Sequence, residues 1–176
     1  QLVFTLAEHF RFSGDRDFAA ALWPAAKRAI AQIESLRATR QTPEFETAEL
    51  RARFGLLPES ASHEGYLAQP VHAYWDDFWA LRGIADASEL ARALGDAGEA
   101  ARLAALHTAF AADVYASIAT TIEQRSIPYV PGSVEWADFD PTATSTAITT
   151  TDAADRLPPA ALAWTYLWMQ AHPKAK

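Results

Sequence analysis

The chain has 176 residues, a length that fits one domain whose core needs no disulfide or metal to hold it together. It contains no cysteine, which excludes disulfides, thiol catalysis and cysteine metal sites. The net charge of −7 and the lack of a lysine or arginine run argue against nucleic acid and against an anionic membrane surface as partners. No apolar stretch reaches 18 residues, so no membrane span is expected.

Apolar residues recur at steps of three and four, which predicts an all-α fold of antiparallel helical hairpins. A first helix is expected over residues 2–12, ended by Gly14. A second is expected from Phe18 to about Arg40, with a kink or restart at Pro24. The helical pattern already runs at the first residue, without an initiator Met or a signal peptide. We therefore expect a piece of a longer protein, whose compartment (periplasmic, secreted or cytoplasmic) stays unknown.

The middle of the chain predicts a short amphipathic helix over 43–54 and then an irregular stretch over 56–72. A loop of that length inside a compact domain is usually functional or mobile. The next helix is expected over 74–84. Asp86 and Asp96 are then expected to cap two more helices, the second ending near residue 124.

The last part of the chain begins with an extended segment over 127–135, which holds two prolines and a glycine. Asp140 followed by Pro141 is a helix-start signal for 142–151, and Pro158-Pro159 opens a last helix to about residue 170. Helix should exceed half of the residues, and any strand should be short and confined to about 127–136.

Three segments, 58–66, 72–79 and 131–140, mix carboxylates with large aromatic side chains at or just before a predicted helix start. Sugar sites need this mixture, because aromatic faces cover pyranose rings while carboxylates bind hydroxyls and supply the acid and base of glycoside hydrolysis. The candidate side chains are Glu59, His63, Glu64, Tyr66, His72, Tyr74, Trp75, Asp76, Asp77, Trp79, Glu135, Trp136 and Asp138.

Simpler interpretations stay open for these residues. Asp76 and Asp77 diverge by about 100° on a helix, so at most one should face a ligand. Acids in a first turn also cap the helix and suit its dipole. The histidines His63 and His72 lack the spacing of a metal site, so neither a metal nor another cofactor is expected.

Several motifs resemble those of the six-hairpin (α/α) toroid glycosidases, the superfamily of glucoamylases, trehalases and processing α-glucosidases. Residues 1–18 look like the inner-helix, turn and outer-helix unit of that ring, with Ala7-Glu8-His9-Phe10 followed by Ser13-Gly14-Asp15 and Phe18. The loop over the ring's mouth is similar to Gly55-Leu56-Leu57-Pro58-Glu59-Ser60, and the start of the next inner helix to Tyr74-Trp75-Asp76-Asp77-Phe78-Trp79. The Trp-Asp step is similar to the general-acid position of trehalase-like enzymes. The Asp-Asp pair is similar to that of endo-α-mannanases of the superfamily, and the two comparisons point to different aspartates.

The resemblance covers about residues 1–150 and implies a carbohydrate-active domain like an inverting glycoside hydrolase, which cleaves O-glycosidic bonds in oligosaccharides. It implies catalytic roles for Asp76 or Asp77 and for Glu135 or a carboxylate outside this chain, with the other candidates binding substrate. A complete toroid has twelve helices, so residues 1–176 would be a single helical domain making up about half a ring. Inner helices of such a ring start at one end, so the three segments should converge on one concave face.

The main alternative is a non-catalytic helical module that binds sugar or a protein partner. A half-ring would expose hairpin faces, so self-association or pairing with missing chain is expected through the apolar flanks 2–10 and 162–169. A third possibility is a structural domain without a ligand, in which the carboxylates are dispersed and each caps a helix.

Overall fold

The computed structural model describes residues 1–62 and 69–171, and it is all-helical as the sequence predicts. Within these residues, β-structure is limited to three isolated bridges, and more than half of the chain is α-helix. The elements in chain order are α1 (Leu2–Ser13), α2 (Arg16–Ala38), the 3-10 turns η1 (Pro43–Glu46) and η2 (Arg51–Arg53), α3 (Tyr74–Leu94), α4 (Ala97–Arg125), α5 (Pro141–Thr151) and α6 (Pro159–Ala171).

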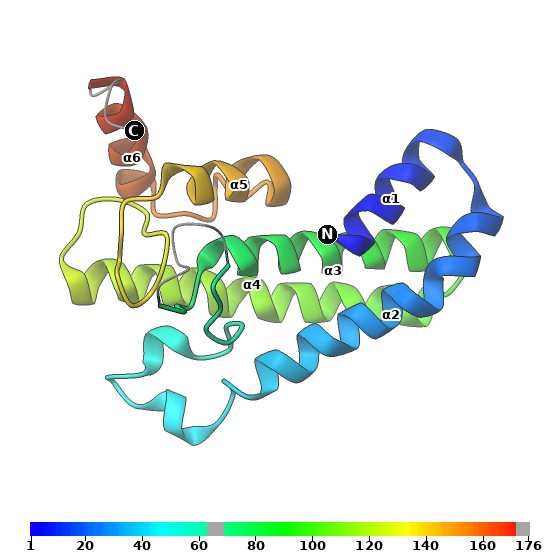
Figure 1. The fold of residues 1–176 in the computed structure, drawn as a ribbon, viewed down its shortest axis with the longest axis horizontal. Helices are drawn as coiled ribbons and strands as arrows, with labels where there is room; N and C mark the ends of the chain where they lie inside the picture. The colour runs from blue at the N-terminus through cyan, green and yellow to red at the C-terminus, as the bar shows by residue number, and fades with distance from the viewer. Residues whose placement is uncertain (63–68, 172–176) are drawn as a thin grey trace.

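Helix α3 is the centre of the molecule and contacts α1, α2, α4 and α5. Figure 1 shows α1, α3 and α5 running in one direction and α2 and α4 returning in the other, and the contacting pairs α1–α2 and α3–α4 form antiparallel hairpins. Phe78, Leu81 and Ile84 of α3 are fully buried, together with Phe110 and Ile118 of α4. A helix packed on so many sides gives its first turn a fixed position. None of the described helices combines the length and apolar character that crossing a bilayer requires.

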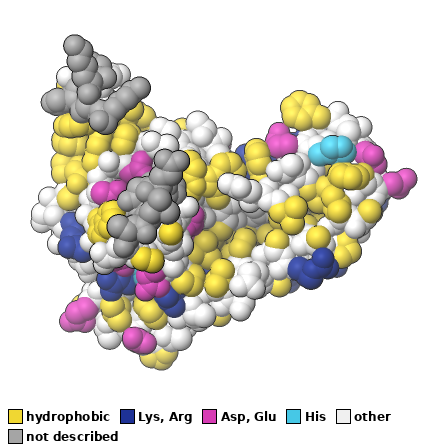
Figure 2. Space-filling model, in the orientation of Figure 1, with side chains coloured by type: hydrophobic (Ala, Val, Ile, Leu, Met, Phe, Trp, Pro, Cys, Tyr) yellow, Lys and Arg dark blue, Asp and Glu magenta, His cyan; other side chains and the backbone are white. Residues whose placement is uncertain are grey.

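Helix α6 packs beside α5 and against the loop that precedes α5. Its Trp164 ring lies 5.3 Å from Tyr129, and its Trp168 ring lies 4.6 Å from Phe139, as measured between ring centroids. The opposite face of α6 is open, with Leu167 64% exposed. Figure 2 shows hydrophobic side chains gathered on this arm of the molecule.

Local signals place most helix ends where the sequence predicts them. The Asp15 carboxylate accepts a hydrogen bond from the Phe18 N–H, and Asp96 caps α4 by accepting from the Glu99 N–H. Gly14 ends α1 with a φ of 67°, in the left-handed region that a glycine adopts without strain. Pro24 causes no restart, because α2 continues from Arg16 to Ala38.

Two predicted boundaries are wrong. The segment 43–54 forms two 3-10 turns instead of a helix, and two of its carbonyls accept hydrogen bonds from side chains of α4. Gln124 donates to the Ala48 oxygen and Ser117 to the Ala52 oxygen. No helix ends near residue 84.

Helix α3 runs on to Leu94, and Asp86 lies inside it as a buried charge, only 1% exposed. Arg82 donates to both Asp86 oxygens at 3.0 and 2.9 Å, and Arg11 of α1 donates to one of them at 2.6 Å. Because the Asp86 carboxylate accepts from two guanidinium groups, it does not cap the free N–H groups of a new helix, and α3 continues through it.

The Asp86→Ala variant should lose about 3 kcal/mol of unfolding free energy, because it removes the buried member of an ion-pair network and leaves Arg11 and Arg82 paired only with more exposed carboxylates such as Glu8. Chemical denaturation measures this loss. Asp17→Ala, which removes an exposed acid of α2, is the matched control and should change stability little. A loss of about 1 kcal/mol at Asp86 would fit a helix cap instead.

Candidate functional site

The three candidate segments meet at the N-terminal end of α3. Ser60 and Val71 exchange two backbone hydrogen bonds of 3.0 Å. The Tyr74 N–H donates to the Gly132 oxygen at 3.0 Å, and the Val134 N–H donates to the His72 backbone oxygen at 3.1 Å. The described parts of the three segments are therefore neighbours here. Their convergence on one concave face stays a prediction, because no residue of 131–140 lines the cavity beside them.

A cavity of about 670 Å³ lies beside this junction, between the start of α1, α2, the loop 57–62 and α3. Two acids, Glu59 and Asp76, and two aromatic residues, Trp75 and Trp79, line it. Most of the remaining wall is apolar, and it includes Leu2, Val3, Ile33, Leu36 and Leu57. An apolar cavity with a few convergent polar groups is the usual form of a small-molecule site.

Asp76 is tied to the loop that covers the cavity. One of its carboxylate oxygens accepts a hydrogen bond from the Ser60 hydroxyl, and the other accepts from the Ser62 hydroxyl at 3.0 Å. The Ser62 N–H in turn donates to the Ser60 hydroxyl oxygen at 3.0 Å. Sequence reasoning missed both serines as functional residues, because a serine in a loop carries no distinctive pattern.

Asp77 points away from the cavity and is 1% exposed. One of its oxygens accepts from the Leu57 N–H at 3.0 Å, and the other has no partner among the described residues. Burial raises the pKa of Asp77 well above its ordinary value; the Leu57 hydrogen bond and the Arg37 charge lower it, while the Asp76 charge adds to the rise. The two aspartates diverge as predicted. Neither caps α3, whose N-cap, Ala73, makes no side-chain capping bond.

A second network links Glu59 to His72 through Arg40, and His72 directly to Glu135. Arg40 forms an ion pair with Glu59 and donates its Nε–H to His72 Nε2 at 3.3 Å. His72 Nδ1 lies 2.8 Å from Glu135 Oε1, and the His72 backbone N–H donates to Glu135 Oε2 at 2.8 Å. Arg53 completes the network with a 2.9 Å bond to Glu135 Oε1.

The donors in these contacts determine which His72 ring nitrogen accepts and which donates. Arg40 can only donate, so His72 accepts at Nε2 and donates from Nδ1 to Glu135. Burial alone would raise the pKa of Glu135, but the His72 side-chain and backbone hydrogen bonds and the Arg53 bond outweigh it and lower the pKa to about 2. Burial likewise opposes ionisation of Glu59, yet its pKa is lowered by hydrogen bonds from its own backbone and from Arg40 and by the Arg40 charge.

The remaining candidates lie outside the cavity wall. Tyr74 is fully buried, and its hydroxyl contacts Ser117 and Thr121 of α4 at 2.8 and 2.9 Å. Trp136 is 42% exposed, and Asp138 accepts from the Ser133 hydroxyl at 2.6 Å. His63, Glu64 and Tyr66 lie outside the described residues. Across residues 1–62 and 69–171, no three His, Asp or Glu side chains group as metal ligands would.

No protein-family model, curated protein or solved structure matches this chain.

The Asp77→Asn variant should melt higher than the wild type at pH 7, and the gain should shrink toward pH 4. The unfolded carboxyl ionises above about 3.8 while the folded one keeps its proton, so the wild type loses stability as pH rises toward the folded pKa. Asparagine has no such proton to lose, and its amide oxygen can still accept from the Leu57 N–H. Thermal melts between pH 4 and 7 test this, with Asp77→Ala as the variant that loses the acceptor. A lower melting temperature of Asp77→Asn at pH 7 would contradict it.

Glu135→Gln should show the opposite pH dependence. The folded pKa of Glu135 is about 2 and its ordinary value is 4.5, so its stabilisation is present above pH 4.5 and is lost as pH falls toward 2. We expect the substitution to cost about 3 kcal/mol at pH 7 and little near pH 2. Urea unfolding at several pH values measures this. Glu123→Gln, an exposed acid on α4, is the control.

Proposed function

We propose that this chain is a carbohydrate-active domain, part of an inverting glycoside hydrolase, which holds a saccharide in the cavity beside α3. The observation that carries the proposal is that Glu59, Trp75, Asp76 and Trp79 line the same cavity. All four are residue types that a sugar site needs, and they come from two segments separated by a loop. The substrate class is an oligosaccharide or other O-glycoside.

The cavity has the means to bind both faces of a sugar. The Trp75 and Trp79 rings lie 6.5 Å apart at an angle of 58°, so they offer differently inclined surfaces to the C–H faces of pyranose rings. Asp76 retains lone pairs beyond those that the serines use, and these can accept from sugar hydroxyls. Arg40 keeps Glu59 ionised and therefore an acceptor as well.

In the hydrolytic reaction, the Asp76 carboxyl would donate its proton to the glycosidic oxygen as the bond to the anomeric carbon breaks. A water would attack that carbon from the opposite face and give its proton to a second carboxylate, about 6.5–9.5 Å from the first in inverting enzymes. Glu59 is the candidate for this base within the described cavity. Glu135 would instead support it, because it orients His72, which contacts Arg40.

The arrangement of the helices supports the larger assembly that the proposal requires. In an (α/α)6 ring, α1, α3 and α5, which run in one direction with contacts from α3 to both others, would be inner helices, and the returning α2 and α4 would be outer helices. A partial ring needs neighbours. Of the two flanks expected to pair, 2–10 exposes Leu2 while Val3 and Leu6 are buried, and 162–169 exposes Leu167 and Met169, so the open face of α6 is the stronger of these two surfaces for another copy or for further chain.

A second candidate function, sugar binding without cleavage, is favoured by one observation. Both Asp76 oxygens already accept hydrogen bonds from serine hydroxyls, so in this structure the group serves as a hydrogen-bond acceptor on both sides. The same cavity would then select a saccharide without protonating it.

Tryptophan fluorescence during titration with gluco- and manno-oligosaccharides tests the cavity. We expect a saturable change in the wild type and about tenfold weaker binding in Asp76→Asn and Glu59→Gln, since each loses a charged hydrogen-bond acceptor. Glu49→Gln, an exposed acid outside the cavity, should bind as the wild type does.

Hydrolysis assays on the longest available form of the protein separate the two functions. Cleavage that Asp76→Asn abolishes while its melting temperature stays nearly unchanged supports the acid role. Binding without cleavage supports the non-catalytic function. The absence of saturable binding to any saccharide rejects both.

A further inference from the structure

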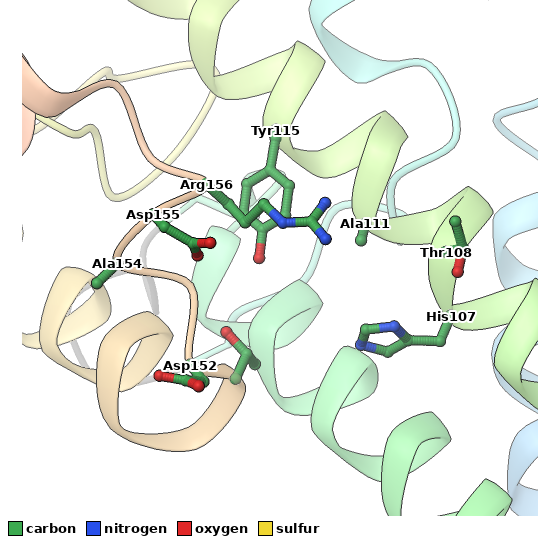
Figure 3. Close-up of a pocket in the computed structure, with 9 residues that line it drawn as sticks. His107, Thr108, Ala111, Tyr115, Asp152, Ala154, Asp155 and Arg156 are labelled. Carbon is green, nitrogen blue, oxygen red and sulfur yellow. The ribbon is translucent and has the colours of Figure 1, made fainter.

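A second cavity, of about 400 Å³, lies between α4 and the turn that joins α5 to α6. It shares no lining residue with the first cavity. His107, Thr108, Ala111 and Tyr115 form its wall on one face of α4, because they recur at helical spacing. Figure 3 shows side chains of the turn facing this wall across the opening, with the Arg156 guanidinium extending between Tyr115 and His107.

The turn opposite α4 is anchored firmly enough to hold its charged residues in place. Ala153 and Leu157 are buried in the core on either side of them. The Ala153 N–H donates to the Ala147 oxygen at 3.3 Å, and the Arg156 N–H donates to the Ala153 oxygen at 2.9 Å. Asp155 and Arg156 are thus presented at the cavity by a turn whose ends cannot shift freely.

The charges around this cavity are not neutralised by direct contact with each other. Within the described parts of the chain, Arg156 forms no ion pair, although Asp152 and Asp155 line the same cavity. Elsewhere on the surface, Arg102 lies within 2.9 Å of both Glu34 and Glu99. A cation and two carboxylates held apart around a cavity leave donors and acceptors available to a ligand.

The net charge of the lining restricts what that ligand can be. Burial and then the Arg156 charge lower the pKa of His107, so this histidine is neutral at pH 7. One guanidinium and two carboxylates leave the lining with an excess of one negative charge. A simple anion is therefore disfavoured, whereas a neutral ligand that both donates and accepts hydrogen bonds fits.

The rest of the lining is hydroxyl-bearing and partly aromatic. The half-buried Tyr115 ring and the neutral His107 ring lie about two helical turns apart along α4, with Ala111 between them. The Thr108 and Thr151 hydroxyls, which donate to carbonyls of their own helices, complete the wall. The volume falls within the range of small-molecule sites, roughly 300–1,000 Å³. Rings of this kind suit the C–H face of a pyranose better than they suit a fully charged ligand.

We propose that the cavity between α4 and the α5–α6 turn is a separate saccharide-binding site, recognising one sugar unit by adjacent hydroxyls. One hydroxyl donates to the Asp155 carboxylate and the next accepts from the Arg156 guanidinium, while the sugar ring rests against Tyr115. The site does not rest on the function proposed above, because none of its residues lines the first cavity.

Nuclear magnetic resonance of the His107 and Tyr115 rings tests this during titration of the whole chain with methyl glucoside, methyl mannoside and methyl galactoside. We expect saturable shifts with at least one glycoside in the millimolar range. Arg156→Gln and Asp155→Asn, both changes at exposed positions, should each weaken binding about tenfold. Arg28→Gln, which removes an exposed arginine of α2, is the charge-matched control and should bind as the wild type does.

Asp76→Asn separates the two cavities, since it should leave the His107 and Tyr115 shifts unchanged even if the first cavity binds nothing. Parallel titrations with glycine and with phosphate test for a charged ligand. Three results would overturn the proposal: no saturable shift with any glycoside, glycoside shifts that persist unchanged in Arg156→Gln, or saturable shifts with glycine or phosphate alone. The last result would assign the cavity to a charged ligand.

Discussion

The hydrogen bond from the Leu57 N–H to the buried carboxyl of Asp77 is the contact on which the geometry of the first cavity depends. It fastens the loop after η2 to the first turn of the most heavily packed helix, and the adjacent Asp76 extends the attachment to Ser60 and Ser62. These hydrogen bonds hold the loop that forms one wall of the cavity in a fixed position against α3. Burying a carboxyl for this purpose is costly unless it is protonated, which agrees with the raised pKa of Asp77.

Three carboxylates around α3 occupy three different electrostatic environments. Asp77 lies in the apolar core with one hydrogen bond, and Glu135 lies between an arginine and a histidine that both bond to it. Glu59 stands at the cavity with Arg40 beside it. Because such environments separate the pKa values of carboxyl groups, one fold can hold a protonated acid and an ionised base at the same pH. The separation is also what a set of purely structural ion pairs would produce, so the cavity lining, and not the pKa values, carries the proposed function.

Local chemistry in the sequence predicted the parts of the fold that local contacts determine. Asp15, Asp96 and Asp140 cap helices because a short carboxylate after an extended residue satisfies the nearest free N–H groups. Asp86 is also an aspartate, but it accepts hydrogen bonds from two arginines, one of them 75 residues away, and no local sequence pattern predicts that contact. The continuation of α3 was missed for this reason.

The candidate site shows the same division. Its acids and aromatics could be found from their clustering in sequence, and Glu59, Trp75, Asp76 and Trp79 do line one cavity. The partners that hold them could not. Ser60 and Ser62 are ordinary loop residues, and the bond between His72 and Glu135 spans 63 residues. The second cavity, around Arg156, lies in a turn that gave no motif at all.

The two serine bonds to Asp76 have a consequence for selectivity. A ligand hydroxyl that approached either carboxylate oxygen along an occupied direction would displace a serine hydroxyl, so the net gain would be the difference between two similar bonds. Contact with the tryptophan rings would then supply most of the affinity, because burial of apolar surface has no internal competitor there. Asp76 would mainly determine which sugar orientations bind. A sugar whose hydroxyls matched the unoccupied lone pairs would bind without disturbing the serines. An epimer that had to displace a serine hydroxyl would bind more weakly and would loosen the loop.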